Sequence, residues 1–225
     1  MAIEVAWQER TVGEYRLHSL VFACDFRVDD VEKWWRWMQR QQDGLARIGA
    51  HHVVVYRSLW EPGRVFVTIG IQQPNSIREL LRSPALFDWF DAAGVRDIPP
   101  IFGGEVVEKV DLDEPTPETS IAGVVVGAIA AVPDVDVLMT NVHAAADRLR
   151  DAGVRKVWVY RALDDGHEVL ILQEIENEAR AREWIRHPDD SAEWMEHVGL
   201  GAYPSLFVGS FTYLMSIDTV GGQVG

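Results

Sequence analysis

Residues 49–59 read GAHHVVVYRSL, and residues 153–163 read GVRKVWVYRAL. Both stretches begin with a glycine, continue into valine-rich sequence and contain the triplet Val-Tyr-Arg. They lie 104 positions apart in a chain of 225 residues. Similarity that recurs at a fixed offset indicates that a structural unit has been duplicated.

The same offset holds well beyond these two stretches, and one inserted residue then shifts it to 105. Between the copies, residues 111–120 read DLDEPTPETS, an acidic and proline-containing sequence typical of a linker. The matched pairs include Asp30 with Asp134, Leu45 with Leu149, Val65 with Val169, Pro84 with Pro188, Trp89 with Trp194 and Phe102 with Phe207. The expected organisation is an N-terminal extension (1–14), a first repeat (15–110), a linker (111–119), a second repeat (120–217) and a flexible tail (218–225).

Within each repeat the patterns occur in one order. An apolar run (15–26, 120–132) predicts a strand, and apolar residues spaced three and four apart from Val31 and from Val135 predict a helix. Two strands joined by a short turn follow, then a helix broken near a proline, then a last strand. The ranges are 52–59, 64–72 and 101–110 for the later strands of the first repeat, and 156–163, 168–176 and 206–217 for those of the second. The predicted fold class is α+β, with two ferredoxin-like βαββαβ repeats in one chain.

The predicted strands are apolar on both faces, although the helices of such a repeat cover only one face of its sheet. The other face therefore needs a cover, and we expect the two sheets to pack face to face as a closed or nearly closed barrel. The sequence leaves open whether the repeats close on each other or on another chain. A homo-oligomer, a dimer or larger, is expected.

Composition narrows the classes of partner. The chain has 35 acidic and 21 basic residues and a net charge of −14, which disfavours nucleic acid and anionic membrane surfaces. Cys24 is the only cysteine, so an intramolecular disulfide and a cysteine-based zinc site are excluded. The longest apolar run, around residues 121–133, is too short to span a membrane. We expect a cytoplasmic protein.

Two longer segments suggest a resemblance. Residues 80–102, LLRSPALFDWFDAAGVRDIPPIF, and residues 184–207, WIRHPDDSAEWMEHVGLGAYPSLF, resemble the second helix and last strand of the dimeric α/β-barrel superfamily. That superfamily includes antibiotic-biosynthesis monooxygenases, haem-degrading monooxygenases, chlorite dismutase-like proteins and small stress-responsive barrel proteins. The resemblance covers residues 15–217 and implies a pseudo-dimer.

The Tyr-Arg pairs kept in both copies are the candidate ligand-binding residues. They are Tyr56 with Arg57 and Tyr160 with Arg161, and in a strand the two members of a pair point to opposite faces. An arginine near a strand end could clamp a carboxylate, and a phenol could hydrogen-bond a ligand oxygen. The alternative is structural, with the arginine paired to an acidic residue and the tyrosine filling a half-wet site.

His51 and His52 suggest a metal site only at first sight. They open a strand, where successive side chains point to opposite faces, so their rings are not expected to converge. Arg155 and Lys156 replace them in the second copy. A polar pair at a strand end and no metal site are predicted.

Three residues of the second repeat are candidate catalytic residues. The resemblance implies His187 or His197 as a haem ligand, because a helix histidine ligates iron in the haem-degrading and chlorite dismutase-like branches. The chain departs from the haem-degrading branch in one respect, since neither first strand contains the asparagine of that branch. Glu174, inside the strand sequence LILQEIE, could act as a general base if burial raised its pKa. The alternatives are surface histidines and an outward-facing Glu174 paired with an arginine.

Three functions are compatible with these features. The first is binding of a small hydrophobic or aromatic molecule between each sheet and its helices, with no cofactor expected. The second, carried by the resemblance, is a monooxygenase that is cofactor-free or uses haem. The third is a structural or stress-response assembly protein. A cavity in one copy alone would indicate which copy carries the function, because duplication usually leaves the other copy structural. We expect the cavity in the second copy, which contains the candidate catalytic residues.

Overall fold

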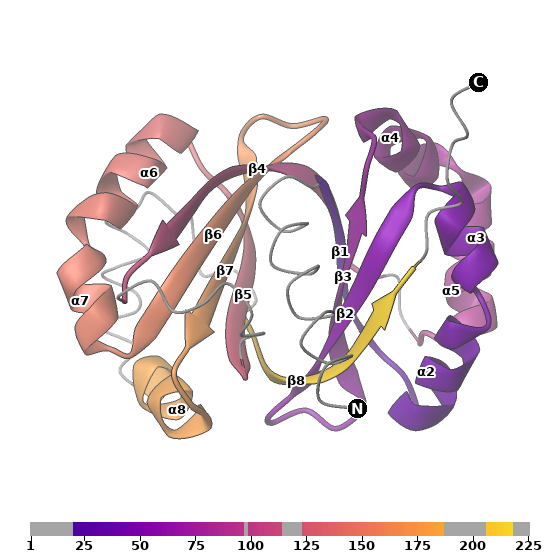
Figure 1. The fold of residues 1–225 in the computed structure, drawn as a ribbon, viewed down its shortest axis with the longest axis horizontal. Helices are drawn as coiled ribbons and strands as arrows, with labels where there is room; N and C mark the ends of the chain where they lie inside the picture. Colours follow the sequence, from indigo (N-terminus) through magenta and orange to yellow (C-terminus); the bar gives the residue numbers. More distant parts are fainter. Residues whose placement is uncertain (1–19, 97–98, 114–122, 187–205, 218–225) are drawn as a thin grey trace.

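Each repeat forms a four-stranded antiparallel sheet with its helices on one face (Figure 1). The computed structural model describes residues 20–96, 99–113, 123–186 and 206–217. The first repeat contains β1 (Leu20–Arg27), α2 (Val31–Gln39), α3 (Gln42–Arg47), β2 (Ala50–Ser58), β3 (Arg64–Ile71), α4 (Pro74–Arg82), α5 (Pro84–Ala93) and β4 (Ile101–Asp111). The second contains β5 (Val124–Ala131), α6 (Val135–Ala144), α7 (Ala146–Asp151), β6 (Val154–Ala162), β7 (Glu168–Ile175), α8 (Glu178–Arg186) and β8 (Leu206–Ser216). The predicted α+β class and strand order are confirmed.

Local sequence signals account for several helix ends. The Asp30 side chain accepts a hydrogen bond from the Lys33 backbone N–H and caps α2, and Asp134 caps α6 in the same way. At the break predicted near Pro84, Ser83 ends α4 and caps α5. The long first helix expected in each repeat is instead two helices, because the backbone tightens into i→i+3 hydrogen bonds such as Gln41 N–H to Met38 carbonyl.

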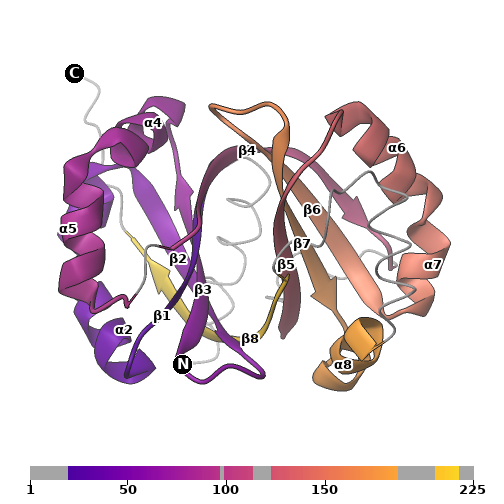
Figure 2. The ribbon, with the colours of Figure 1, turned by 180° about the vertical axis from the view of Figure 1, so that it is seen from behind.

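The two sheets close into one eight-stranded barrel in the order β1-β3-β2-β8-β5-β7-β6-β4. The last strand of each repeat makes the closure. The first half of β4 pairs with β1 and its second half pairs with β6, while β8 pairs with β5 and then with β2. Figure 2 shows both long strands crossing between the halves. The repeats therefore close on each other within one chain, which resolves the alternative left open by the sequence.

The apolar side chains form one cluster inside the barrel and one beneath the helices of each repeat. Alternation along β2 assigns Val53 and Val55 to the helix side of the sheet and Val54 and Tyr56 to the barrel interior. The interior is filled largely by aromatic rings, namely those of Tyr56, Phe66, Phe102, Trp158, Tyr160 and Phe207.

Two glycines that match at the shifted offset are needed where the halves join. A Cβ atom on Gly104 would lie 2.5 Å from the Arg161 carbonyl oxygen and 2.4 Å from the Phe102 ring. A Cβ atom on Gly209 would meet the Arg57 carbonyl oxygen and the Phe207 ring, both at 2.5 Å. Only glycine lets β4 and β8 approach the neighbouring repeat this closely.

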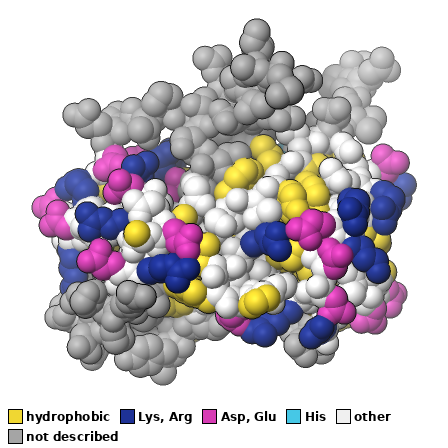
Figure 3. All heavy atoms as spheres, turned by 90° about the horizontal axis from the view of Figure 1, so that it is seen from below, with side chains coloured by type: hydrophobic (Ala, Val, Ile, Leu, Met, Phe, Trp, Pro, Cys, Tyr) yellow, Lys and Arg dark blue, Asp and Glu magenta, His cyan; other side chains and the backbone are white. Residues whose placement is uncertain are grey.

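On the face shown in Figure 3, acidic and basic side chains are interspersed and form no large single-sign patch on the described surface. Within the described residues, no helix is long and apolar enough to cross a membrane. The predicted N-terminal extension, tail and most of the linker lie outside the described residues.

Candidate functional site

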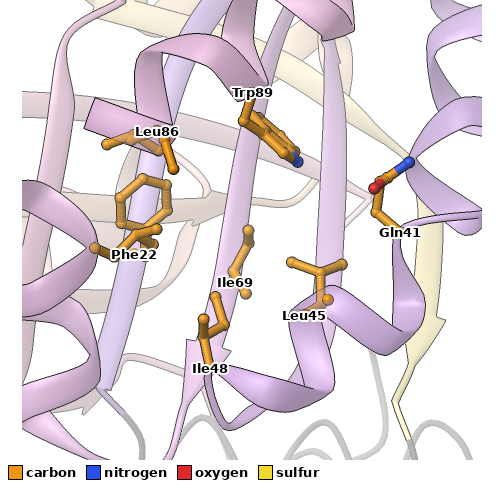
Figure 4. Close-up of a pocket in the computed structure, with 10 residues that line it drawn as sticks. Phe22, Gln41, Leu45, Ile48, Ile69, Leu86 and Trp89 are labelled. Carbon is orange, nitrogen blue, oxygen red and sulfur yellow. The ribbon is translucent and has the colours of Figure 1, made fainter. Parts of the chain in front are cut away.

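A cavity of about 200 Å³ lies between the sheet of the first repeat and its helices (Figure 4). A cavity at this place, between a sheet and its helices, is the predicted binding site of a small molecule. The cavity lies beneath α3, α4 and α5. The lining residues are Phe22, Gln41, Gly44, Leu45, Ile48, Ile69, Leu80, Ala85, Leu86 and Trp89.

The helical repeat and the strand alternation bring these residues together. Phe22 and Ile69 project from β1 and β3 toward the helices, and with Leu45 and Leu86 they form a buried floor. Gly44 and Ala85 are exposed and therefore mark the mouth between α3 and α5. A narrow, apolar and partly open site results.

The lining of the cavity is almost entirely apolar and carries no charge. None of the ten lining residues has a titratable side chain, and only Gln41 and Trp89 carry polar side-chain atoms. Such a lining selects apolar, uncharged ligands, because a charged group would lose its hydration without gaining a partner.

The second repeat carries different residues at the matching positions. Arg148 stands where Gly44 lines the first cavity, and Trp184, which is 8% exposed, stands where Leu80 does. Gln173 replaces Ile69, and its buried Oε1 has no hydrogen-bond partner within the described residues. The described cavity thus lies in the first repeat, whereas the sequence pointed to the second. The residues that match α5 in sequence fall within 187–205, outside the described residues.

The four predicted ligand-binding residues do not line this cavity. Tyr56 and Tyr160 are buried inside the barrel, at 1% and 4% exposure. Arg57 Nη1 donates to Glu32 Oε1 at 3.0 Å, and Arg161 Nη2 donates to an oxygen of Glu105 at 2.6 Å. Both ion pairs are largely exposed and contribute little stability. The ligand-binding role of these residues remains a prediction. The ion pairs of the two arginines match the structural alternative, whereas the two tyrosines are buried and do not fill the half-wet site that it assumed.

The expectation that His51 and His52 point to opposite faces is wrong. The β2–β3 register shifts between Ala50 and His52, so the extra residue His51 turns to the same side as His52. The two Nδ1 atoms are 2.8 Å apart, and both residues are buried. A Cβ atom on Gly70 would lie 2.3 Å from His52 Cε1 and 2.6 Å from His51 Cε1, so both rings cover this glycine.

Burial also changes the acid–base behaviour of the pair. Desolvation lowers the pKa of His51 to about 4, because the imidazolium form would lose its hydration inside the protein. His51 is therefore uncharged near neutral pH. In the contact between the two Nδ1 atoms one ring donates and the other accepts, and which ring donates depends on the tautomer.

Glu174 lies inside the barrel, so the outward-facing alternative is wrong. Glu174 is 5% exposed, and its backbone partner in the β6–β7 register is Lys156, which is also buried. These two residues occupy the places of Gly70 and His52 in the first repeat. The Arg155 side chain extends to Asp113 and Glu176 instead of turning inward. A general-base role for Glu174 stays untested, and it does not line the cavity.

The remaining catalytic candidates, His187 and His197, lie outside the described residues. Among the described residues, no group of three or more His, Cys, Asp or Glu side chains could hold a metal ion. The cavity lining offers no histidine, cysteine, tyrosine or methionine that could ligate haem iron. The described site therefore does not fit haem.

Comparison with known proteins identifies the fold. No family profile and no curated protein sequence matches the chain. A solved structure of an anthrone oxidase-like protein is similar over 91% of this chain and 96% of its own length, with a TM-score of 0.67 and 12% identity. The structure of a monooxygenase candidate from Fusobacterium nucleatum subsp. nucleatum is similar over 88% of this chain and 94% of its own length, with a TM-score of 0.53 and 8% identity. The structure of a chlorite dismutase candidate is similar over 86% of this chain and 94% of its own length, with a TM-score of 0.52 and 14% identity. The chain thus has the ferredoxin-like dimeric α/β-barrel fold, with both halves of the barrel in one polypeptide.

Proposed function

We propose that the chain is an oxidoreductase of monooxygenase type whose substrate is a small aromatic molecule bound in the cavity of the first repeat. The cavity carries this proposal, because its floor and walls are apolar and two of its ten lining residues, Phe22 and Trp89, are aromatic. The similarity in fold to an anthrone oxidase-like protein supports the class of reaction.

The volume limits the size of the substrate. An engineered apolar cavity of about 150 Å³ binds benzene, whereas sites for drug-sized ligands occupy about 300–1,000 Å³. At about 200 Å³ this cavity suits a molecule of one or two rings. Larger substrates would require α3 and α5 to separate.

The lining restricts the mechanism to one in which the substrate supplies its own acidity. In the proposed reaction a ring CH₂ group and O₂ give a ring carbonyl and water, so that dioxygen is the oxidant and one oxygen atom enters the product. The carbon must first lose a proton, and none of the lining side chains is a base. The protein would enclose and orient an activated phenolic or keto substrate that ionises readily.

Gly44 allows a direct test. A Cβ atom added there meets nothing within 4 Å, and the second repeat carries Arg148 at this position, so Gly44→Trp should fold while filling the mouth. Gly44→Ala adds only a methyl group and is the matched control. Oxygen consumption and product mass are measured with 2-indanone and 2-tetralone, two-ring ketones that carry the acidic ring CH₂ group required by the proposed reaction.

The wild type and Gly44→Ala should consume oxygen, and Gly44→Trp should lose most of this activity. Equal oxidation by all three proteins would place the reaction elsewhere and refute the proposal. Ligand binding that Gly44→Trp blocks, with no oxygen uptake by any variant, would indicate a binding protein instead.

A further inference from the structure

We propose that the molecule bound in this cavity is a flat aromatic compound with one uncharged ring oxygen, a hydroxyl or carbonyl, which Gln41 and Trp89 hold. The inference rests on the proposed function, because it concerns the same cavity. It adds the chemistry by which the site would select and orient its substrate.

Gln41 and Trp89 are the two polar members of an otherwise apolar lining. Gln41 precedes α3 at the N-cap position, yet its side chain makes no capping hydrogen bond. Within the described residues, neither the Gln41 amide nor the Trp89 indole nitrogen has a hydrogen-bond partner in the protein. Both groups are half-buried and belong to the walls of the cavity, so a ligand can reach them.

The two groups give the cavity a polar side and an apolar side. In Figure 4 the indole nitrogen of Trp89 is on the ring edge that faces Gln41, while Phe22 and Leu86 lie on the opposite side. Aromatic neighbours hold the indole in place, since its centroid is 5.1 Å from that of Trp37 and 5.3 Å from that of Phe90. A ligand would therefore place its oxygen toward Gln41 and its bare ring toward Phe22.

Donor and acceptor properties define the oxygen. The indole N–H only donates, whereas the amide can donate or accept. A ring hydroxyl accepts from Trp89 and donates to Gln41, and a ring carbonyl accepts from both. A carboxylate is disfavoured, because no cationic side chain lines the cavity.

Of the two polar groups, Gln41 is specific to the first repeat. Ala145 stands at the position of Gln41 in the second repeat, so the duplication did not keep an amide there. No pattern in the sequence singles out Gln41, because a single glutamine beside a helix is most often solvated.

The test compares two ligands of nearly the same shape, 1-naphthol and 1-methylnaphthalene, by NMR titration. Wild-type protein should bind 1-naphthol about fivefold more tightly, the order of ratio that one net hydrogen bond supplies. In Gln41→Leu and in Trp89→Phe this ratio should fall toward one, while the affinity for 1-methylnaphthalene changes little. Gln39→Leu, at an exposed glutamine of α2, is the matched control and should keep the wild-type ratio.

Thermal unfolding of each variant checks that it is folded. Equal affinity of the wild type for both ligands, or a ratio unchanged in Gln41→Leu and Trp89→Phe, would overturn this inference and leave binding in the cavity intact. Binding of neither ligand by the folded wild type would instead count against the proposed function itself.

Discussion

Acid should destabilise the first repeat through the buried His51–His52 pair. His51 is 3% exposed, and its pKa is lowered from 6.5 to about 4 in the folded protein. The unfolded chain therefore binds the proton first as the pH falls, which favours unfolding. The contribution is fully present above about pH 6.5 and is lost progressively as the pH falls toward about 4.

The size of the effect follows from the shift. Each pKa unit corresponds to about 1.4 kcal/mol, so the change in His51 is linked to about 3 kcal/mol of unfolding free energy. This is a large part of the ~5–15 kcal/mol that stabilises a typical domain. Desolvation is the cause, and the close packing of both rings over Gly70 leaves little room for water to hydrate the imidazolium form.

Urea unfolding at about pH 7.5 and about pH 4.5 measures this term, and His51→Asn isolates it. Asparagine keeps a polar atom near the place of Nδ1 but does not titrate. The wild type should lose about 2–3 kcal/mol more than His51→Asn over this interval. His167→Asn, at an exposed histidine, should behave as the wild type. Parallel losses in the wild type and His51→Asn would refute the reasoning.

Three further predictions test the packing and the asymmetry of the repeats. Gly70→Ala should cost about 1–3 kcal/mol in urea unfolding, because both histidine rings must move away from the new methyl group. Gly104→Ala should lower the free energy of unfolding more than Gly70→Ala does, because its methyl group would meet the backbone carbonyl oxygen of Arg161, which cannot move aside as a side chain can. A smaller loss than in Gly70→Ala would contradict this reasoning. Calorimetric titration with 1-naphthol should give one site per chain, because Arg148 and Trp184 stand where Gly44 and Leu80 line the cavity; two equal sites would contradict it.

The candidate site was less accessible to sequence reasoning than the fold. The prediction of a cavity between sheet and helices is met in the first repeat, yet its lining residues had not been singled out as ligand contacts. Tyr56 and Arg57, which persist in both copies, lie outside the cavity, the first inside the barrel and the second in a surface ion pair. Duplication preserves what every copy needs, whereas a site used once leaves no repeated signal.

The sequence by itself determined the architecture. The offset between the copies, the alternation in the strands and the caps at Asp30 and Asp134 are local or periodic signals, and they specify two βαββαβ units that must share a core. Tertiary structure alone decided the details that matter for function. A single-residue bulge turned His51 inward, and the spacing between α3 and α5 left the cavity open. The bulge and the cavity both depend on how segments distant in the sequence pack together. The periodic pattern of a strand or a helix predicts neither a bulge nor an unfilled volume.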